Sequence, residues 1–152
     1  MIAKQRIGIV GAGMMGHGIA KNLVEKGFPL AVRGHRSRAP IDDLVGRGAT
    51  EVKTNADLAR ASDIVILCVT GAPQVEEVMF GPEGVASAAR PGTIVVDTST
   101  SEPATTAKMR EALAKQDVRF VDAPLARTPV EAEQGRLNTM VGADDATFAE
   151  LK

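Results

Sequence analysis

The glycine-rich segment Gly11-Ala12-Gly13-Met14-Met15-Gly16 restricts the fold of this chain more than any other segment. It follows an apolar run at 6–10, typical of a buried strand, and precedes apolar residues that recur at helical spacing until Gly27. Glycines in this spacing permit a tight turn, close approach of the backbone to a pyrophosphate, and close packing of helix on strand. Because the amides at such a helix start favour phosphate, we expect a dinucleotide to bind at Gly11, Gly13 and Gly16.

Short apolar runs alternate with helical stretches along the rest of the chain. Further strands are predicted at 30–32, 50–52, 63–69, 93–97, 119–122 and 138–141. Helices are predicted at 41–45, 56–61, 73–80, 102–116 and 130–134, with a further helix starting at Asp144. We expect Asn55 and Ser101 to cap the second and fourth of these. This order predicts an α/β fold of the Rossmann type, doubly wound, with a mainly parallel sheet flanked by helices.

The composition excludes several classes of protein. Of the 152 residues, 44% are apolar and the net charge is −1, which together argue against intrinsic disorder. Balanced charge, four Phe and no Trp or Tyr give no reason to expect a nucleic-acid partner. No apolar run approaches the roughly 18 residues of a membrane span and no export signal is recognised, so we expect a cytoplasmic location and no membrane partner. The single cysteine, Cys68, stands in an apolar run and is interpreted as an inert buried thiol.

The end of the second predicted strand bears on the choice of nucleotide. Proteins that bind NAD usually place an acidic residue there, about 20 residues after the glycine turn. Here residues 32–38 are Val-Arg-Gly-His-Arg-Ser-Arg, and no acid occurs before Asp42. Guanidiniums suit a 2′-phosphate because they donate two parallel bonds, although a solvated basic loop is the alternative. The segment favours NADP over NAD, with predicted contacts from His35, Arg36, Ser37 and Arg38.

The chain resembles the β-hydroxyacid dehydrogenase family, which includes 3-hydroxyisobutyrate dehydrogenase and tartronate semialdehyde reductase. Residues 7–23 match the family's opening pattern, G-x-G-x-M-G followed by A-x-N-L. Residues 79–85 are similar to a family turn, 97–103 to its D-x-S-T-x-x-P element, and 122–142 to its substrate-binding segment. The resemblance implies an oxidoreductase that moves a hydride between NADP(H) and a short 3-hydroxy acid or semialdehyde.

The same resemblance implies further cofactor contacts. Met14 and Met15 would join the glycines at the pyrophosphate, and Thr100 would lie near the nicotinamide. The loop Val69, Thr70 and Gly71 would lie beside a ribose, although the family usually has Leu-Pro at the first two positions. Without the resemblance, Thr100 would be interpreted as a helix-capping hydroxyl.

The predicted substrate loop departs from the family, which commonly has Ser-Gly-Gly where this chain has Ala126, Arg127 and Thr128. The sulfolactaldehyde reductases of the family are similar, with Gly-Arg-Thr. A cation with a neighbouring hydroxyl would favour a small anionic hydroxy acid or semialdehyde, including one with a sulfonate or a second carboxylate. The alternative is that Arg127 points into solvent and Ala126 only fills space.

The family's general acid/base is a lysine in a G-x-x-G-x-G-x-x-x-K helix of a second, helical domain. No segment here matches it, so the resemblance places that lysine beyond Lys152 and predicts no catalytic residue in this chain. We therefore expect residues 1–152 to be the dinucleotide-binding domain alone, without the helical domain, and the full-length form to be a homo-oligomer. His17 is interpreted as packing on a helix face or contacting a phosphate. No metal site is predicted.

Two other interpretations remain open. The chain could be a stand-alone module that senses NADP(H) or pairs with a separate chain. It could also be a relative of the imine reductases, which have a similar nucleotide domain, although the segment Asp122-Ala123-Pro124 argues against this.

Overall fold

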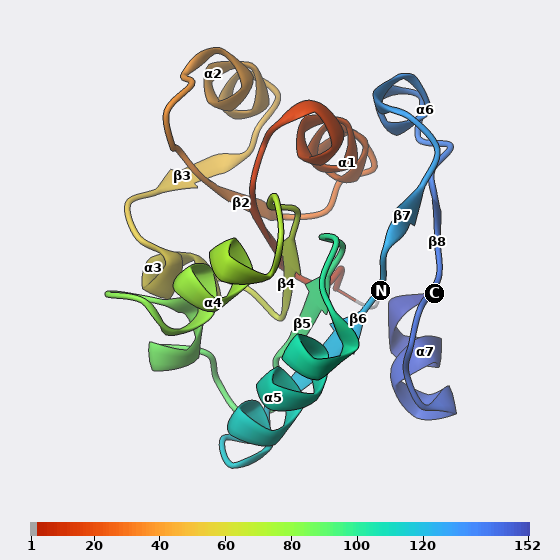
Figure 1. The fold of residues 1–152 in the computed structure, drawn as a ribbon. Helices are drawn as coiled ribbons and strands as arrows, with labels where there is room; N and C mark the ends of the chain where they lie inside the picture. Colours follow the sequence, from red (N-terminus) through yellow and green to blue (C-terminus); the bar gives the residue numbers. More distant parts are fainter. Residues whose placement is uncertain (1–2) are drawn as a thin grey trace.

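The computed structural model describes residues 3–152, so the first two residues of the predicted domain lie outside it. Six parallel strands form one sheet in the order β3-β2-β1-β4-β5-β6, with helices on both faces (Figure 1). The strands are β1 (Ile7–Val10), β2 (Leu30–Arg33), β3 (Thr50–Val52), β4 (Ile64–Leu67), β5 (Ile94–Asp97) and β6 (Arg119–Asp122). This arrangement confirms the predicted doubly wound Rossmann-type fold. A separate antiparallel pair joins β7 (Leu125–Ala126) to β8 (Asn138–Thr139).

The helices divide between the two faces of the sheet. One face packs against α1 (Met14–Glu25) and α2 (Ala39–Gly46), and the other against α3 (Asn55–Arg60), α4 (Ala72–Phe80) and α5 (Pro103–Ala114). A short 3₁₀ helix, η1 (Val85–Ser87), lies with the second group. Near the end of the chain come α6 (Pro129–Glu133) and α7 (Asp145–Leu151). No helix among residues 3–152 is long and apolar enough to cross a membrane.

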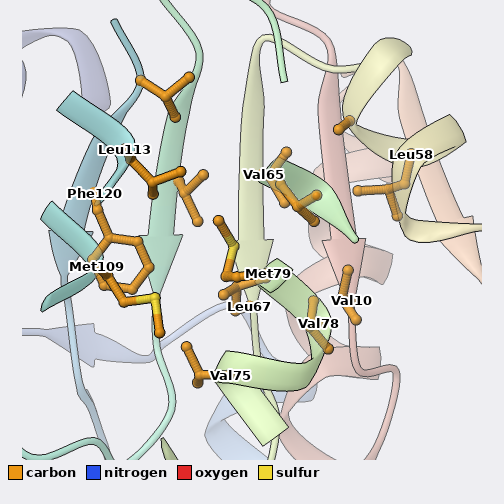
Figure 2. Close-up of a cluster of buried hydrophobic side chains, with 14 of the residues drawn as sticks. Val10, Leu58, Val65, Leu67, Val75, Val78, Met79, Met109, Leu113 and Phe120 are labelled. Carbon is orange, nitrogen blue, oxygen red and sulfur yellow. The ribbon is translucent and has the colours of Figure 1, made fainter. Parts of the chain in front are cut away.

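The core on the second face includes apolar residues of β1, α3, β4, α4, α5 and β6 (Figure 2). Val65 and Leu67 of β4 contribute to it, whereas Ile64 and Ile66 of the same strand belong to the core of the opposite face. Alternate residues of a strand point to opposite faces, so this run must be apolar throughout. The central position predicted for this strand is therefore confirmed, although the strand itself is shorter than 63–69.

Two predicted helix caps are wrong. Thr54, and not Asn55, caps α3, because the Thr54 side chain accepts a hydrogen bond from the Asp57 amide at 3.0 Å. Glu102 occupies the cap position of α5, and Ser101 instead donates its hydroxyl to Asp97 at 2.8 Å. The predicted strand at 138–141 is also shorter and pairs outside the main sheet. The differences at Ser101 and at 138–141 arise from contacts with other segments that local sequence patterns do not reveal.

Strand order creates the place where a ligand can bind. The chain forms β2 and β3 on one side of β1 and then crosses to form β4 on the other side. The loops that follow β1 and β4 consequently leave in opposite directions at the carboxyl edge of the sheet. In open α/β sheets a crevice forms at such a switch point, and ligands bind there.

Candidate functional site

The glycine turn lies between β1 and α1, and its three glycines have different surroundings. A side chain at Gly16 would place its Cβ 1.7 Å from the Gly11 carbonyl oxygen, and one at Gly11 would lie 2.1 Å from that of Cys68. Gly11 also has a φ of +98°, which side chains disfavour. By contrast, a Cβ at Gly13 would meet nothing within 4 Å. Two glycines thus allow the turn to pack, and the third leaves its backbone open to a ligand.

A cleft of about 770 Å³ opens at this turn. Its walls come from the turn, the loop after β2, the loop after β4, and one side of α4. Most of the predicted cofactor residues line it, namely Gly11, Gly13, Met14, Met15, Gly16, His35, Arg36, Ser37, Val69 and Thr70. Arg33 of the basic segment lines it as well, and so does Asn55, which was predicted only as a helix cap. The fold therefore gathers segments far apart in the sequence around one opening.

Three predicted cofactor residues, Arg38, Gly71 and Thr100, do not line the cleft. Arg38 donates to Asp42 at 2.8 Å and to Glu51 at 3.0 Å, and the bond to Glu51 lowers the pKa of that carboxyl. Gly71 lies beside Thr100, because a Cβ on Gly71 would be 3.6 Å from the Thr100 carbonyl oxygen. Gly71 follows β4 and Thr100 follows β5, and neither lines the cleft.

The loops after β4 and β5 are joined by a buried hydrogen-bond network. The Val69 amide donates to the Ser99 hydroxyl at 2.9 Å, and the Ser99 amide donates to Asp97 at 2.9 Å. Thr98 donates its hydroxyl to the Leu67 carbonyl at 2.7 Å. Asp97 is fully buried and also accepts from Ser101. This network fixes the backbone at Val69, which forms part of the cleft wall.

Cys68 follows the end of β4 and is only partly buried, so its predicted place inside a buried strand is wrong. It lines the cleft, where burial raises the pKa of its thiol. A raised pKa reduces the thiolate population, in keeping with the interpretation of an inert thiol. Among residues 3–152, no group of three or more His, Cys, Asp and Glu side chains is arranged to hold a metal ion.

The predicted substrate loop lies outside this cleft, between β7 and α6. Ala126 belongs to β7, and Arg127 is exposed with a φ of +85°, in the left-handed region. Thr128 caps α6 together with Glu131, whose carboxylate accepts from the Thr128 amide at 3.0 Å and also from its hydroxyl. The hydroxyl proposed to contact substrate is thus already used in holding the start of a helix.

A second cavity of about 730 Å³ lies near β6, between α5 and α7. Arg110 and Arg119 line it, but Arg110 donates to the Phe120 and Gly142 carbonyls, and Arg119 donates to Glu150. None of the predicted site residues lies there. The glycine turn is therefore the better candidate site.

An open glycine turn at the switch point of a parallel sheet defines an NAD(P)-binding domain of the Rossmann type. The chain belongs to the family described as the NAD binding domain of 6-phosphogluconate dehydrogenase, whose model matches residues 6–152.

Two of the curated relatives are hydroxyacid oxidoreductases. The chain is 37% identical over 147 residues to 2-(hydroxymethyl)glutarate dehydrogenase of Eubacterium barkeri, covering 97% of this chain and 48% of the relative. It is 35% identical over 148 residues to 2-hydroxy-3-oxopropionate reductase of Escherichia coli strain K12, covering 97% and 50%. The structure of Psf3 in complex with NADP+ and 2-OPP is similar with a TM-score of 0.87 and 29% identity, covering 95% of this chain and 51% of that one. The resemblance to β-hydroxyacid dehydrogenases is confirmed, and the chain spans about half the length of these curated relatives.

Proposed function

We propose that this chain binds NADP(H) as the cofactor domain of an oxidoreductase that interconverts short 3-hydroxy acids and semialdehydes. One observation carries the choice of NADP(H): the basic loop after β2 lines the same cleft as the glycine turn. Two of the curated relatives are hydroxyacid oxidoreductases, and Psf3, with 29% identity, was solved with NADP+.

In this proposal the backbone amides around Gly13 hold the pyrophosphate at the start of α1. Arg36, with His35 and Ser37, faces the 2′-phosphate, while Val69 and Thr70 border a ribose. Gly71 continues the same loop beside the ribose, and Thr100 lies toward the nicotinamide end. A nicotinamide bound here would supply or accept the hydride, and the residues of this chain would bind and orient it.

The substrate proposal rests on Arg127, whose exposed guanidinium follows β7. A guanidinium forms charge-assisted hydrogen bonds to a carboxylate or a sulfonate, so the substrate class is a small anionic hydroxy acid or semialdehyde. Ala126 leaves space beside it, and Thr128 holds the loop through its helix cap. The proton on the substrate hydroxyl requires a general acid/base. We place that group, a lysine, outside this chain.

The experiment is a titration of the 152-residue chain with NADPH and with NADH at the same salt concentration. We expect NADPH to bind at least about tenfold more tightly, because a 2′-phosphate adds charge-assisted hydrogen bonds. Equal affinity would remove the NADP(H) proposal but leave an NAD(P)-binding domain. No binding of either nucleotide would overturn the proposed role of the cleft.

A further inference from the structure

The methionines of this chain differ sharply in their exposure to solvent. Met14 is 79% exposed and Met140 is 65% exposed. Met79 and Met109, by contrast, are fully buried in the core, and Met15 is partly buried. A thioether is oxidised to a sulfoxide where an oxidant can reach it. The fold therefore leaves two methionines open to oxidation, one at the glycine turn and one that follows β8.

Met14 stands where a cofactor would bind. It is the first residue of α1, and it lines the cleft. The cap residue of this helix, Gly13, has no side chain that could accept from the first amides, and the first turn from Met14 to His17 contains no acid. The first amides of a helix lack partners within the helix, so they attract oxygen acceptors and anions. Another oxygen carried by this turn would compete for them.

Oxidation of Met14 supplies such an oxygen. The thioether sulfur gives an electron pair to hydrogen peroxide, the O–O bond breaks, one oxygen forms the S=O bond and the other leaves as water. The apolar side chain thereby becomes polar and gains an acceptor. Side-chain oxygens at a helix start accept from its first amides, as capping residues do. The sulfoxide oxygen thus competes with the pyrophosphate for the same donors and places partial negative charge beside it.

We propose that Met14 is an oxidation site at which hydrogen peroxide lowers the affinity of this chain for its cofactor, and that bound cofactor protects Met14. This inference rests on the proposed function only in that a nucleotide must occupy the cleft, whichever of NADP(H) and NAD(H) is preferred. The modification is reversible, because sulfoxide reductases restore the thioether. Met140 is the matched site, since it is similarly exposed but is not a lining residue of the cleft.

The first experiment treats the 152-residue chain with hydrogen peroxide, stops the reaction with catalase and maps the sulfoxides by tandem mass spectrometry. We expect Met14 and Met140 to react at least about tenfold faster than the buried methionines. Saturating NADP+ should slow the oxidation of Met14 at least about threefold and leave that of Met140 unchanged. A rate at Met14 that NADP+ does not change would contradict the proposed competition.

The second experiment measures the dissociation constant for NADPH before and after peroxide treatment. We expect oxidation to raise it at least about fivefold in the native chain and in Met140→Leu. In Met14→Leu it should change less than about twofold from that variant's own starting value. Sulfoxide reductases with dithiothreitol should restore the affinity, whereas dithiothreitol alone, which reduces oxidised thiols, should not.

The outcomes separate this inference from the proposed function. Cys68 also lines the cleft, so each measurement is repeated in Cys68→Ala. If the loss of affinity persists in Met14→Leu, or disappears in Cys68→Ala, the oxidation proposal is wrong and cofactor binding stands. Unchanged affinity with Met14 fully converted has the same meaning. If the untreated chain binds neither NADPH nor NADH, both proposals fail. Thermal unfolding after treatment should show a retained fold, and a loss of fold that accounts for the weaker binding would overturn the proposal.

Discussion

The imidazole of His17 joins α1 to α6, since its Nδ1 lies 2.6 Å from Glu133 Oε1. Its other nitrogen, Nε2, lies 2.8 Å from Asp43 Oδ2 on α2. Both ring nitrogens therefore face carboxylates, and only the doubly protonated ring can donate to both. Of the two earlier interpretations, helix-face packing fits this position better than phosphate contact. The helix that begins at the glycine turn is thus connected to the helix that follows the predicted substrate loop.

The His17 contacts predict a pH-dependent stability. Burial lowers the pKa of His17, but the hydrogen bonds that its ring donates to Glu133 and Asp43 outweigh that effect, so the net change raises the pKa above its usual value. A raised folded-state pKa contributes stability that is complete below the unfolded pKa and is lost as the pH rises through the folded pKa. We expect His17→Gln to lower the free energy of unfolding by up to about 1 kcal/mol near pH 6, and by less near pH 9.

Urea unfolding of both chains between pH 5.5 and 9 measures this difference. The two partner carboxylates have lowered pKa values and stay ionised across that range. A difference in free energy of unfolding that does not change with pH would contradict the prediction.

Gly18 predicts a packing effect at the same helix contact. A Cβ there would lie 2.5 Å from the Ala132 carbonyl carbon and 2.7 Å from the Glu133 amide nitrogen, both backbone atoms of α6. We expect Gly18→Ala to destabilise the chain by about 1–3 kcal/mol, because α6 must move. The matched control is Gly46→Ala in α2, where a Cβ meets nothing within 4 Å and a small gain in stability is expected. Chemical denaturation measures both, and equal effects would refute the close contact.

Gly13 and Gly16 should separate binding from folding. Gly13→Ala leaves the packing intact but places a methyl group at the open turn, so NADPH and NADH should both bind at least about tenfold more weakly. Gly16→Ala would clash with the Gly11 carbonyl oxygen at 1.7 Å and should reduce stability itself. Calorimetric titration of each variant measures the cofactor affinity, and thermal unfolding measures the stability. Unchanged cofactor affinity in Gly13→Ala would show that the cofactor binds elsewhere.

The isolated chain should bind NADPH without turning over substrate. We expect negligible oxidation of NADPH in the presence of a short anionic semialdehyde, because no lysine of this chain matches the family's catalytic pattern. The decrease in NADPH absorbance with time, at saturating cofactor, measures this oxidation. Sustained turnover would mean that a residue within this chain performs the proton transfer.

Short-range patterns predicted most of the fold. Alternating apolar runs located the strands of the main sheet, and Asp144 caps α7 as expected, accepting from the Thr147 amide at 2.9 Å. The wrong caps have a physical cause. Thr54 and Asn55 are both good capping residues, and only the extended backbone of Thr54, with φ −127° and ψ 161°, decides between them. Ser101 is drawn to the buried Asp97, whose position depends on the sheet.

The sequence by itself determined the glycine turn and the alternation of strands and helices, because backbone sterics and side-chain periodicity act between near neighbours. It also placed a basic segment after β2. Only the tertiary structure decided which arginines remain unpaired, because Glu51 reaches Arg38 through the pairing of β2 with β3. The same holds for His17, whose partners Asp43 and Glu133 come from helices 26 and 116 residues away. Charge pairing depends on distance in space, and folding sets that distance.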